Sequence, residues 1–305
     1  MILVTGGLGM IGAHTARALV DLGHEVVVTA YRRTEVPSFL AGRVTVEALD
    51  VTDRHAFLAL AGRHDVSDIV HLAGTIPDED PVRFFRTDTT GLLNALDAAR
   101  SWGVRRFAVA GSLGVYIGRT ETRWHEDLAL PAARLPHLIV AFKKAVEPLT
   151  THSLQGSGVQ PVVLRIGTIW GPLVHPEIPF HIPSYISAVL RGQEPPQLYA
   201  DDGFDCCYAP DAGRAIALLM TAETLPHDTY NVSSGRPATN REFADALQAI
   251  TPGLRLDLLP GRQDGPGEDP YLDITRLTHD TGFAPTFDVA TAVADYVAWR
   301  ADNPR

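Results

Sequence analysis

The chain has 305 residues, 45% of them hydrophobic and 20% charged, an ordinary globular composition with enough apolar residues for a sizeable core. Its formal net charge of -10 argues against nucleic acid and anionic membranes as partners, because both attract basic surfaces. No apolar run reaches the ~20 residues of a membrane span, and the first residues run directly into a motif, so we expect neither a membrane helix nor a signal peptide.

The first half of the chain alternates short β-rich runs with helical stretches. Strands are expected at 1–5, 25–30, 44–50, 68–74, 105–112 and 160–167, and helices at 11–23, 53–64, 89–103 and 138–152. Apolar strands that alternate with helices predict a doubly wound α/β fold, in which helices cover both faces of a parallel sheet.

The texture changes after about residue 170, where proline and histidine become frequent. Helices are expected at 186–192, 211–224, 240–250 and 289–302, with a strand at 230–234. We expect a dinucleotide-binding domain of residues 1–165 plus about 211–235. A smaller C-terminal substrate lobe would then comprise about 166–210 and 236–305.

The only two cysteines are the neighbours Cys206 and Cys207. Adjacent cysteines rarely form a disulfide with each other, and nothing around them has metal-ligand spacing. We therefore expect small buried residues in a strand, no metal site, and a reducing, cytoplasmic setting.

The stretch "VTGGLGMIG" places Gly6, Gly9 and Gly12 between the first strand and the first helix. Glycines permit the tight turn and a close approach of the backbone to a pyrophosphate, and the helix N-terminus supplies free N–H groups. At the start of a βαβ chain this pattern predicts dinucleotide binding.

The series "TGGLGMIG", "LDVTD", "VHLAG", "LRIGTIWGP" and "YNVSSGRPATNREFADAL" resembles the extended short-chain dehydrogenase/reductases, the NAD-dependent epimerase/dehydratase group. The resemblance implies a doubly wound Rossmann sheet with a C-terminal substrate lobe. It also implies a homodimer joined through the helices at about 90–102 and 138–152. The cofactor-binding positions that it implies are Gly6, Gly9, Met10, Ile11, Gly12, Asp50, Val51, Leu72, Ala73, Gly74 and Lys143.

The end of the second strand bears on the choice of dinucleotide. NAD enzymes of this fold commonly place a carboxylate there for the adenosine ribose. Here that place is Ala30, and Arg32 and Arg33 follow closely. A missing acid beside two guanidinium groups suits a 2′-phosphate. We expect NAD(P), with NADP favoured over NAD; the alternative is that both arginines are solvated loop residues.

In the family that the chain resembles, a serine, a tyrosine and a lysine carry the chemistry. The tyrosine exchanges a proton with the substrate oxygen, and the lysine charge lowers the pKa of that tyrosine. "GSLGVYIG" places Ser112 at the serine position. Lys143 matches the lysine, because Glu147 follows it by four residues as a glutamate often does in the family. The tyrosine position then falls on Ile139, which cannot carry a proton, and a register shifted by one gives Val140.

Two residues could replace the missing phenol. His137 lies six residues before Lys143 and so on another helix face, which favours a helix-entry or surface role. Asp88 stands where the family often has asparagine; it would hold a water or a proton, or simply cap a helix.

The substrate side keeps little of the family pattern. Phe204 replaces one phosphate-binding arginine, Arg262 resembles a second, and Thr168 replaces a common asparagine. The resemblance also places Thr75 and Leu113 beside a small-molecule substrate. Asp78, Glu79 and Asp80 form an acidic loop that is either solvated or repels anionic substrates.

Three functions follow. The first is an NAD(P)-dependent oxidoreductase, epimerase or dehydratase that acts on a small hydroxy, carbonyl or sugar-like substrate without the tyrosine. The second is a non-redox lyase, dehydratase or cyclase in the same pocket. The third is a catalytically silent dinucleotide-binding protein.

Overall fold

The computed structural model describes residues 1–303 except 33, 78–79, 133–134, 175–180 and 266, and it leaves the side chains of 181–183 undescribed. Seven of the described strands form one parallel sheet in the order β10-β7-β5-β4-β1-β2-β3. Their bounds are β1 (Ile2–Thr5), β2 (Val26–Ala30), β3 (Thr45–Ala48), β4 (Asp68–His71), β5 (Arg106–Ala110), β7 (Gln160–Ile166) and β10 (Thr229–Val232). The predicted doubly wound α/β fold is confirmed.

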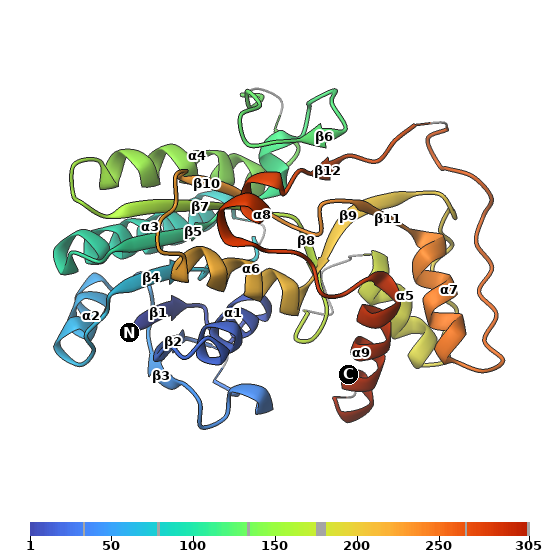
Figure 1. Cartoon of the computed structure of the whole chain (residues 1–305), viewed down its shortest axis with the longest axis horizontal. Coiled ribbons are helices and arrows are strands. Elements are labelled where there is room, and N and C mark those ends of the chain that lie inside the picture. Colours follow the sequence, from blue (N-terminus) through green and yellow to red (C-terminus); the bar gives the residue numbers. More distant parts are fainter. Residues whose placement is uncertain (33, 78–79, 133–134, 175–180, 266, 304–305) are drawn as a thin grey trace.

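Two helical layers cover the sheet (Figure 1). Helices α1 (Met10–Asp21), α6 (Ala209–Thr221) and α8 (Thr275–Thr281) pack on one face. Helices α2 (Arg54–Leu58), α3 (Pro81–Trp102) and α4 (Leu138–Leu154) pack on the other. Short 3₁₀ helices occur at η1 (Ser38–Leu40), η2 (Ala59–Gly62) and η3 (Leu113–Tyr116).

The later residues build a smaller body beside this sheet (Figure 1). A three-stranded sheet joins β8 (Thr168–Trp170), β9 (Gly203–Tyr208) and β11 (Pro237–Thr239). Helices α5 (His181–Leu190), α7 (Asn240–Ile250) and α9 (Val289–Asp302) surround it. An aromatic core of Trp170, Tyr208, Phe243 and Tyr296 holds this body together.

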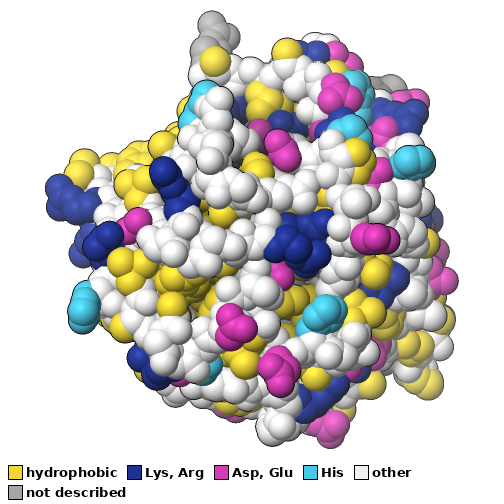
Figure 2. Space-filling model, turned by 60° about the vertical axis from the view of Figure 1, so that its left-hand side comes forward, with side chains coloured by type: hydrophobic (Ala, Val, Ile, Leu, Met, Phe, Trp, Pro, Cys, Tyr) yellow, Lys and Arg dark blue, Asp and Glu magenta, His cyan; other side chains and the backbone are white. Residues whose placement is uncertain are grey.

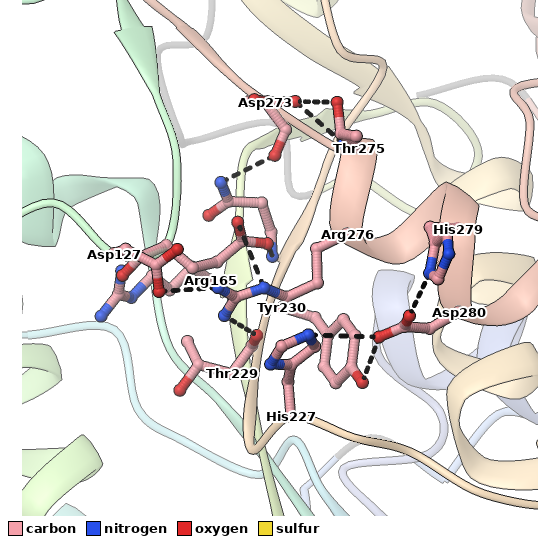
Figure 3. A network of polar contacts seen from close by, with 12 residues as sticks. Asp127, Arg165, His227, Thr229, Tyr230, Asp273, Thr275, Arg276, His279 and Asp280 are labelled. Carbon is pink, nitrogen blue, oxygen red and sulfur yellow. Dashed lines mark hydrogen bonds and ion pairs between the residues drawn. The ribbon is translucent and has the colours of Figure 1, made fainter.

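Polar contacts bind the C-terminal part of the chain back onto the main sheet (Figure 3). The Tyr230 hydroxyl on β10 donates to Asp280 of α8 over 2.9 Å. The Arg276 guanidinium donates to the Thr229 carbonyl at 3.2 Å and to Asp127 at 2.7 Å. Asp127 follows β6 (Arg123–Trp124), which pairs with β12 (Tyr271–Leu272). Residues of the predicted dinucleotide-binding domain and of the predicted C-terminal lobe therefore contact each other. The domain boundaries stay a prediction.

Several local expectations can be compared with the structure. Cys206 and Cys207 are buried in β9, as predicted. Helix α3 starts at Pro81, eight residues before the expected start at 89. Asp80 is its N-cap and accepts hydrogen bonds from the Val82 and Arg83 N–H groups, so this carboxylate caps the helix. Asp78 and Glu79 lie outside the described residues.

None of the described helices combines the length and apolar character that a membrane span requires.

Candidate functional site

The turn between β1 and α1 is shaped by two glycines. Gly6 has a φ of 66°, in the left-handed region that favours glycine. A side chain at Gly12 would collide with the Gly6 carbonyl, so the helix can start close to the turn only with glycine there. Gly9 is the N-cap and has no side chain to occupy the first-turn N–H groups. The end of α1 is therefore open to an anion.

A groove of about 640 Å³ opens above this turn. It runs along the carboxyl ends of β1, β2, β3 and β4, the edge where ligands bind in such sheets. The predicted cofactor residues on its wall are Gly6, Gly9, Arg32, Asp50, Val51, Leu72, Ala73 and Gly74. Met10, Ile11 and Gly12 form the first turn of α1 behind them. The shape and the donor set fit a dinucleotide.

One end of the groove lies beside β2. This strand ends at Ala30, so no carboxylate occupies the usual ribose-binding place. Asp50, at the neighbouring strand, accepts hydrogen bonds from the Thr52 N–H at 2.9 Å and the Thr52 hydroxyl at 2.7 Å. Arg32 lines the groove, and Arg33 lies outside the described residues.

The other end of the groove holds Thr75 and Asp88. The Thr75 hydroxyl donates to the Asp88 carboxylate at 2.8 Å, and the Thr75 N–H donates to it at 3.1 Å. Burial raises the pKa of Asp88, although the Thr75 hydrogen bonds and the Lys143 charge act in the opposite direction. Thr75, expected beside the substrate, thus lies on the wall of the dinucleotide groove.

Lys143 occupies a small cavity next to this end. Its ammonium donates to the Ala110 carbonyl at the end of β5 over 2.7 Å. Burial lowers the pKa of Lys143 to about 8, against the opposing effect of the Asp88 carboxylate. His71 lines the same cavity, and burial, then the Lys143 charge, lowers its pKa to about 3. The imidazole is therefore neutral and bonds to the Thr5 hydroxyl at 2.9 Å.

The side chains at the two positions predicted for the family tyrosine are apolar. Ile139 is half-buried and packs against the core between α3 and α4. Val140 is buried against Gly114 of η3. A Cβ added to Gly114 would come within 2.7 Å of the Val140 side chain. Neither residue supplies a proton, whichever register holds.

Ser112 and Leu113 begin the turn that follows β5. The Ser112 hydroxyl accepts a hydrogen bond from the Gly114 N–H at 3.0 Å and so caps η3. Tyr116, at the end of η3, is buried and donates to Asn231 at 2.9 Å, which excludes it as a free acid in the groove. His137 is exposed at the N-cap of α4, which agrees with a helix-entry role.

The remaining predicted substrate residues lie in the smaller body. Thr168 begins β8, and the Phe204 ring stacks on Phe243 at 6.3 Å. Arg262 is paired with Asp269 at 2.8 Å, so its guanidinium is engaged in this conformation. The structure does not bring these three residues into the dinucleotide groove.

Known proteins agree with this geometry. The profile of the NAD dependent epimerase/dehydratase family matches residues 2–233. The chain belongs to that family. A dTDP-glucose 4,6-dehydratase of Streptomyces griseus is 29% identical, over 98% of this chain and 93% of its own length. The relatives are enzymes, and this family member is an enzyme as well.

Solved structures share the fold of this family member. A UDP-glucose 4-epimerase from Thermotoga maritima, solved with UDP-glucose, gives a TM-score of 0.84 at 22% identity and covers 100% of this chain and 99% of its own. A UDP-glucose-4-epimerase from Stenotrophomonas maltophila, solved with NAD and formylated UDP-arabinopyranose, gives 0.83 at 22% identity, with 99% and 98% covered. At these identities the likeness establishes the fold.

Two contacts in this epimerase/dehydratase family member were missed by sequence reasoning. The sequence marks Asp88 as a departure from asparagine, but it gives no signal that Thr75 holds the carboxylate. His71 stands inside the quoted "VHLAG" motif, yet only the structure shows its ring beside Lys143.

Proposed function

We propose that this enzyme binds NAD(P) in the groove and acts on a nucleotide sugar as an epimerase or dehydratase. The observation that carries the proposal is the meeting, at one edge of the sheet, of the glycine-shaped groove and the Lys143 ammonium. The relatives named above act on dTDP-glucose and UDP-glucose, which supports the substrate class.

The chain's own residues would share the work of binding. The first turn of α1 would hold the pyrophosphate, and the walls of the groove would hold the adenosine and nicotinamide halves. When bound, the nicotinamide supplies a hydride acceptor and donor. The buried position of Lys143 keeps its charge near the end of the groove.

NADP is the dinucleotide that this part of the proposal favours. Arg32 lines both the groove and an adjoining cavity of about 320 Å³, and Arg83 of α3 lines that second cavity. With Ala30 in place of a carboxylate, the Arg32 guanidinium would face a 2′-phosphate at the β2 end of the groove. NAD is named with the Stenotrophomonas structure, so both dinucleotides belong in every assay.

A homodimer through α3 and α4 is also part of the proposal. Val82 and Leu93 of α3 are 61% and 45% exposed. Figure 2 brings this side of the molecule forward and shows hydrophobic side chains gathered in patches between charged ones. A second copy would bury them. Leu93→Glu should shift the protein toward monomer in light scattering, whereas Leu22→Glu, at another exposed leucine, should not.

A non-redox reaction in the same pocket is the second candidate. The apolar Ile139 at the position of the tyrosine favours it, because isoleucine cannot relay a proton to a carbonyl oxygen. The two candidates differ in whether reduced nicotinamide forms during turnover.

The test is incubation of the protein with NAD or NADP and with dTDP-glucose, UDP-glucose or UDP-glucuronate, followed by mass spectrometry and nicotinamide absorbance. We expect a new sugar nucleotide and a transient rise in reduced nicotinamide, both lost in Lys143→Met. Product without any nicotinamide signal would favour the non-redox reaction. No dinucleotide binding would contradict both.

A further inference from the structure

Asp88 lies where two hollows meet. Its carboxylate is on the wall of the dinucleotide groove, and it also lines the cavity that holds Lys143 and His71. Thr75 fixes the carboxylate with two donors, one from its hydroxyl and one from its backbone. Asp88 is thus an oriented acidic group, with the groove on one side and the cavity that holds a buried cation on the other.

The groups that face Asp88 come from α4, from β4 and from the loop that follows β4. Lys143 of α4 carries a positive charge, His71 of β4 is neutral, and Thr75 donates hydrogen bonds. Burial raises the pKa of Asp88 and lowers the pKa of Lys143, so the difference between the two pKa values becomes smaller. Groups whose pKa values are perturbed by burial beside a charged partner cluster at functional sites.

Several other proton carriers among the described residues are engaged elsewhere, including the Tyr31 hydroxyl of the groove wall, which bonds to Asp50. The Ser112 hydroxyl accepts the Gly114 N–H, and the Tyr116 hydroxyl donates to Asn231 in the core. Lys143 lines the cavity behind Asp88, where its ammonium is held by the Ala110 carbonyl. Among the described groove residues, Asp50 is the other carboxylate, and it bonds to Thr52 toward the β2 end.

We propose that Asp88 exchanges the proton with the substrate oxygen in place of the missing phenol, and that Lys143 is the positioning cation behind it. This inference rests on the proposed function. In the oxidative direction the substrate O–H bond breaks and an O–H bond forms on Asp88. The hydrogen and the two electrons of the adjacent C–H bond go to the nicotinamide dinucleotide, the oxidant of the proposed function. Reduction runs the same step backwards, and Asp88 then returns the proton.

The chain is well suited to a direct test of the coupling. It has only two lysines, Lys143 and Lys144, so NMR of isotope-labelled lysine side chains gives one signal for each. The test compares Asp88→Asn with Asp97→Asn, a matched change on the same helix at a carboxylate paired with Arg54 on the surface. Because the Asp88 charge raises the pKa of Lys143, Asp88→Asn should move that pKa below its value of about 8.

The titration decides the coupling even if no substrate is found. The Lys144 signal and the Asp97→Asn protein should titrate as in the native protein. An unchanged Lys143 titration in Asp88→Asn would overturn the inference. Circular dichroism checks that each variant is folded. If Asp88→Asn unfolds, Asp88→Glu, which keeps a carboxylate, is used in its place. The pKa of Lys143 in Asp88→Glu should stay above the pKa of Lys143 in an Asp88→Ala protein.

Turnover gives the second readout. On any nucleotide sugar that the native protein converts, Asp88→Asn should lower kcat about 10²–10⁴-fold, the usual contribution of general acid–base catalysis. Asp88→Glu should recover part of the loss, and Asp97→Asn should keep native activity. Native-like kcat in Asp88→Asn would overturn the inference and leave the proposed function intact. If the native protein converts nothing, the proposed function fails and the lysine titration alone judges the coupling.

Discussion

The carboxylate of Glu147 on α4 accepts two hydrogen bonds, each 2.8 Å long, from the guanidinium of Arg165 on β7. The same guanidinium donates to the Tyr116 hydroxyl at 2.7 Å and to the Glu126 carbonyl at 2.9 Å. This cluster ties α4 to the sheet one helical turn from Lys143. The position of the lysine in its cavity therefore depends on an ion pair that is itself largely buried.

Glu147→Ala should destabilise the fold strongly, because it leaves the buried Arg165 charge without its partner. Breaking a pair of this kind typically costs about 3–5 kcal/mol. Asp97→Ala, which breaks the exposed Arg54 pair, should cost about 0–1 kcal/mol. The free energies of unfolding come from urea titrations of the two variants and the native protein. Equal losses would mean that the Glu147–Arg165 pair is no more important than a surface contact.

Lys143→Met should stabilise the protein near neutral pH. Lys143 has a folded pKa of about 8 against 10.5 for a free lysine, so the unfolded chain binds more protons between these values. The stabilising contribution of the neutral amine is fully present above about pH 10.5 and is lost as the pH falls through about 8. At pH 7 the buried ammonium should cost about 3 kcal/mol, at about 1.4 kcal/mol per pKa unit.

The measurement is the free energy of unfolding of Lys143→Met and of the native protein at pH 7 and pH 10. The advantage of the variant should shrink at the higher pH. Lys144→Met serves as the control, because Lys144 does not line the Lys143 cavity and its ammonium donates to the Pro131 carbonyl. A pH-independent difference for Lys143→Met would show that the lysine is not buried as a cation.

The sequence predicted the sheet well, because its signals are local. Apolar β-rich runs that alternate with helices predicted a parallel sheet covered on both faces, and the structure agrees. The expected helix at 89–103 misses the first eight residues of α3, although Asp80 and Pro81 are a helix-start pair. The capping signal of these two residues predicts the missing helix, which is about two turns long.

The site was predicted less completely, because its contacts join residues far apart in the chain. Nothing local links Thr75 to Asp88, or His71 to Lys143. Arg262 matched a family pattern, yet its partner in this conformation is Asp269, which a pattern of single residues does not reveal. The roles of Ser112, Lys143 and the cofactor residues stay predictions until the proposed assays are done.

Arg32→Ala should weaken NADPH more than NADH. The reason is that Arg32 lines the groove beside Ala30, where a 2′-phosphate would lie, and a charged hydrogen bond is worth about 1.5–3 kcal/mol. Fluorescence titration gives the dissociation constants of both cofactors for the native protein and the variant. Arg54→Ala, a surface arginine on α2, is the control. Equal native affinities for NADPH and NADH, with the same loss of both in Arg32→Ala, would remove the argument for NADP.

Ile139→Tyr should place a phenol at the position that the sequence predicts for the family tyrosine. Ile139 is half-buried one turn before Lys143 and on the same helix face, so a tyrosine ring there would point toward the lysine end of the groove. The larger ring should cost about 1–3 kcal/mol of stability through overpacking. Reduction of test carbonyl compounds, followed by the loss of NADPH absorbance, should rise above that of the native protein.

The control for this substitution is the neighbouring residue. Val140 is buried on Gly114, so Val140→Tyr should collide with η3, lower stability more, and give no gain in reduction. Activity gained by Val140→Tyr and not by Ile139→Tyr would show that the helix register is shifted by one. The comparison also bears on Asp88. If Asp88 and the new phenol serve the same proton, Ile139→Tyr should recover more activity in an Asp88→Asn background than in the native one. Equal gains in both backgrounds would mean that the two groups act independently.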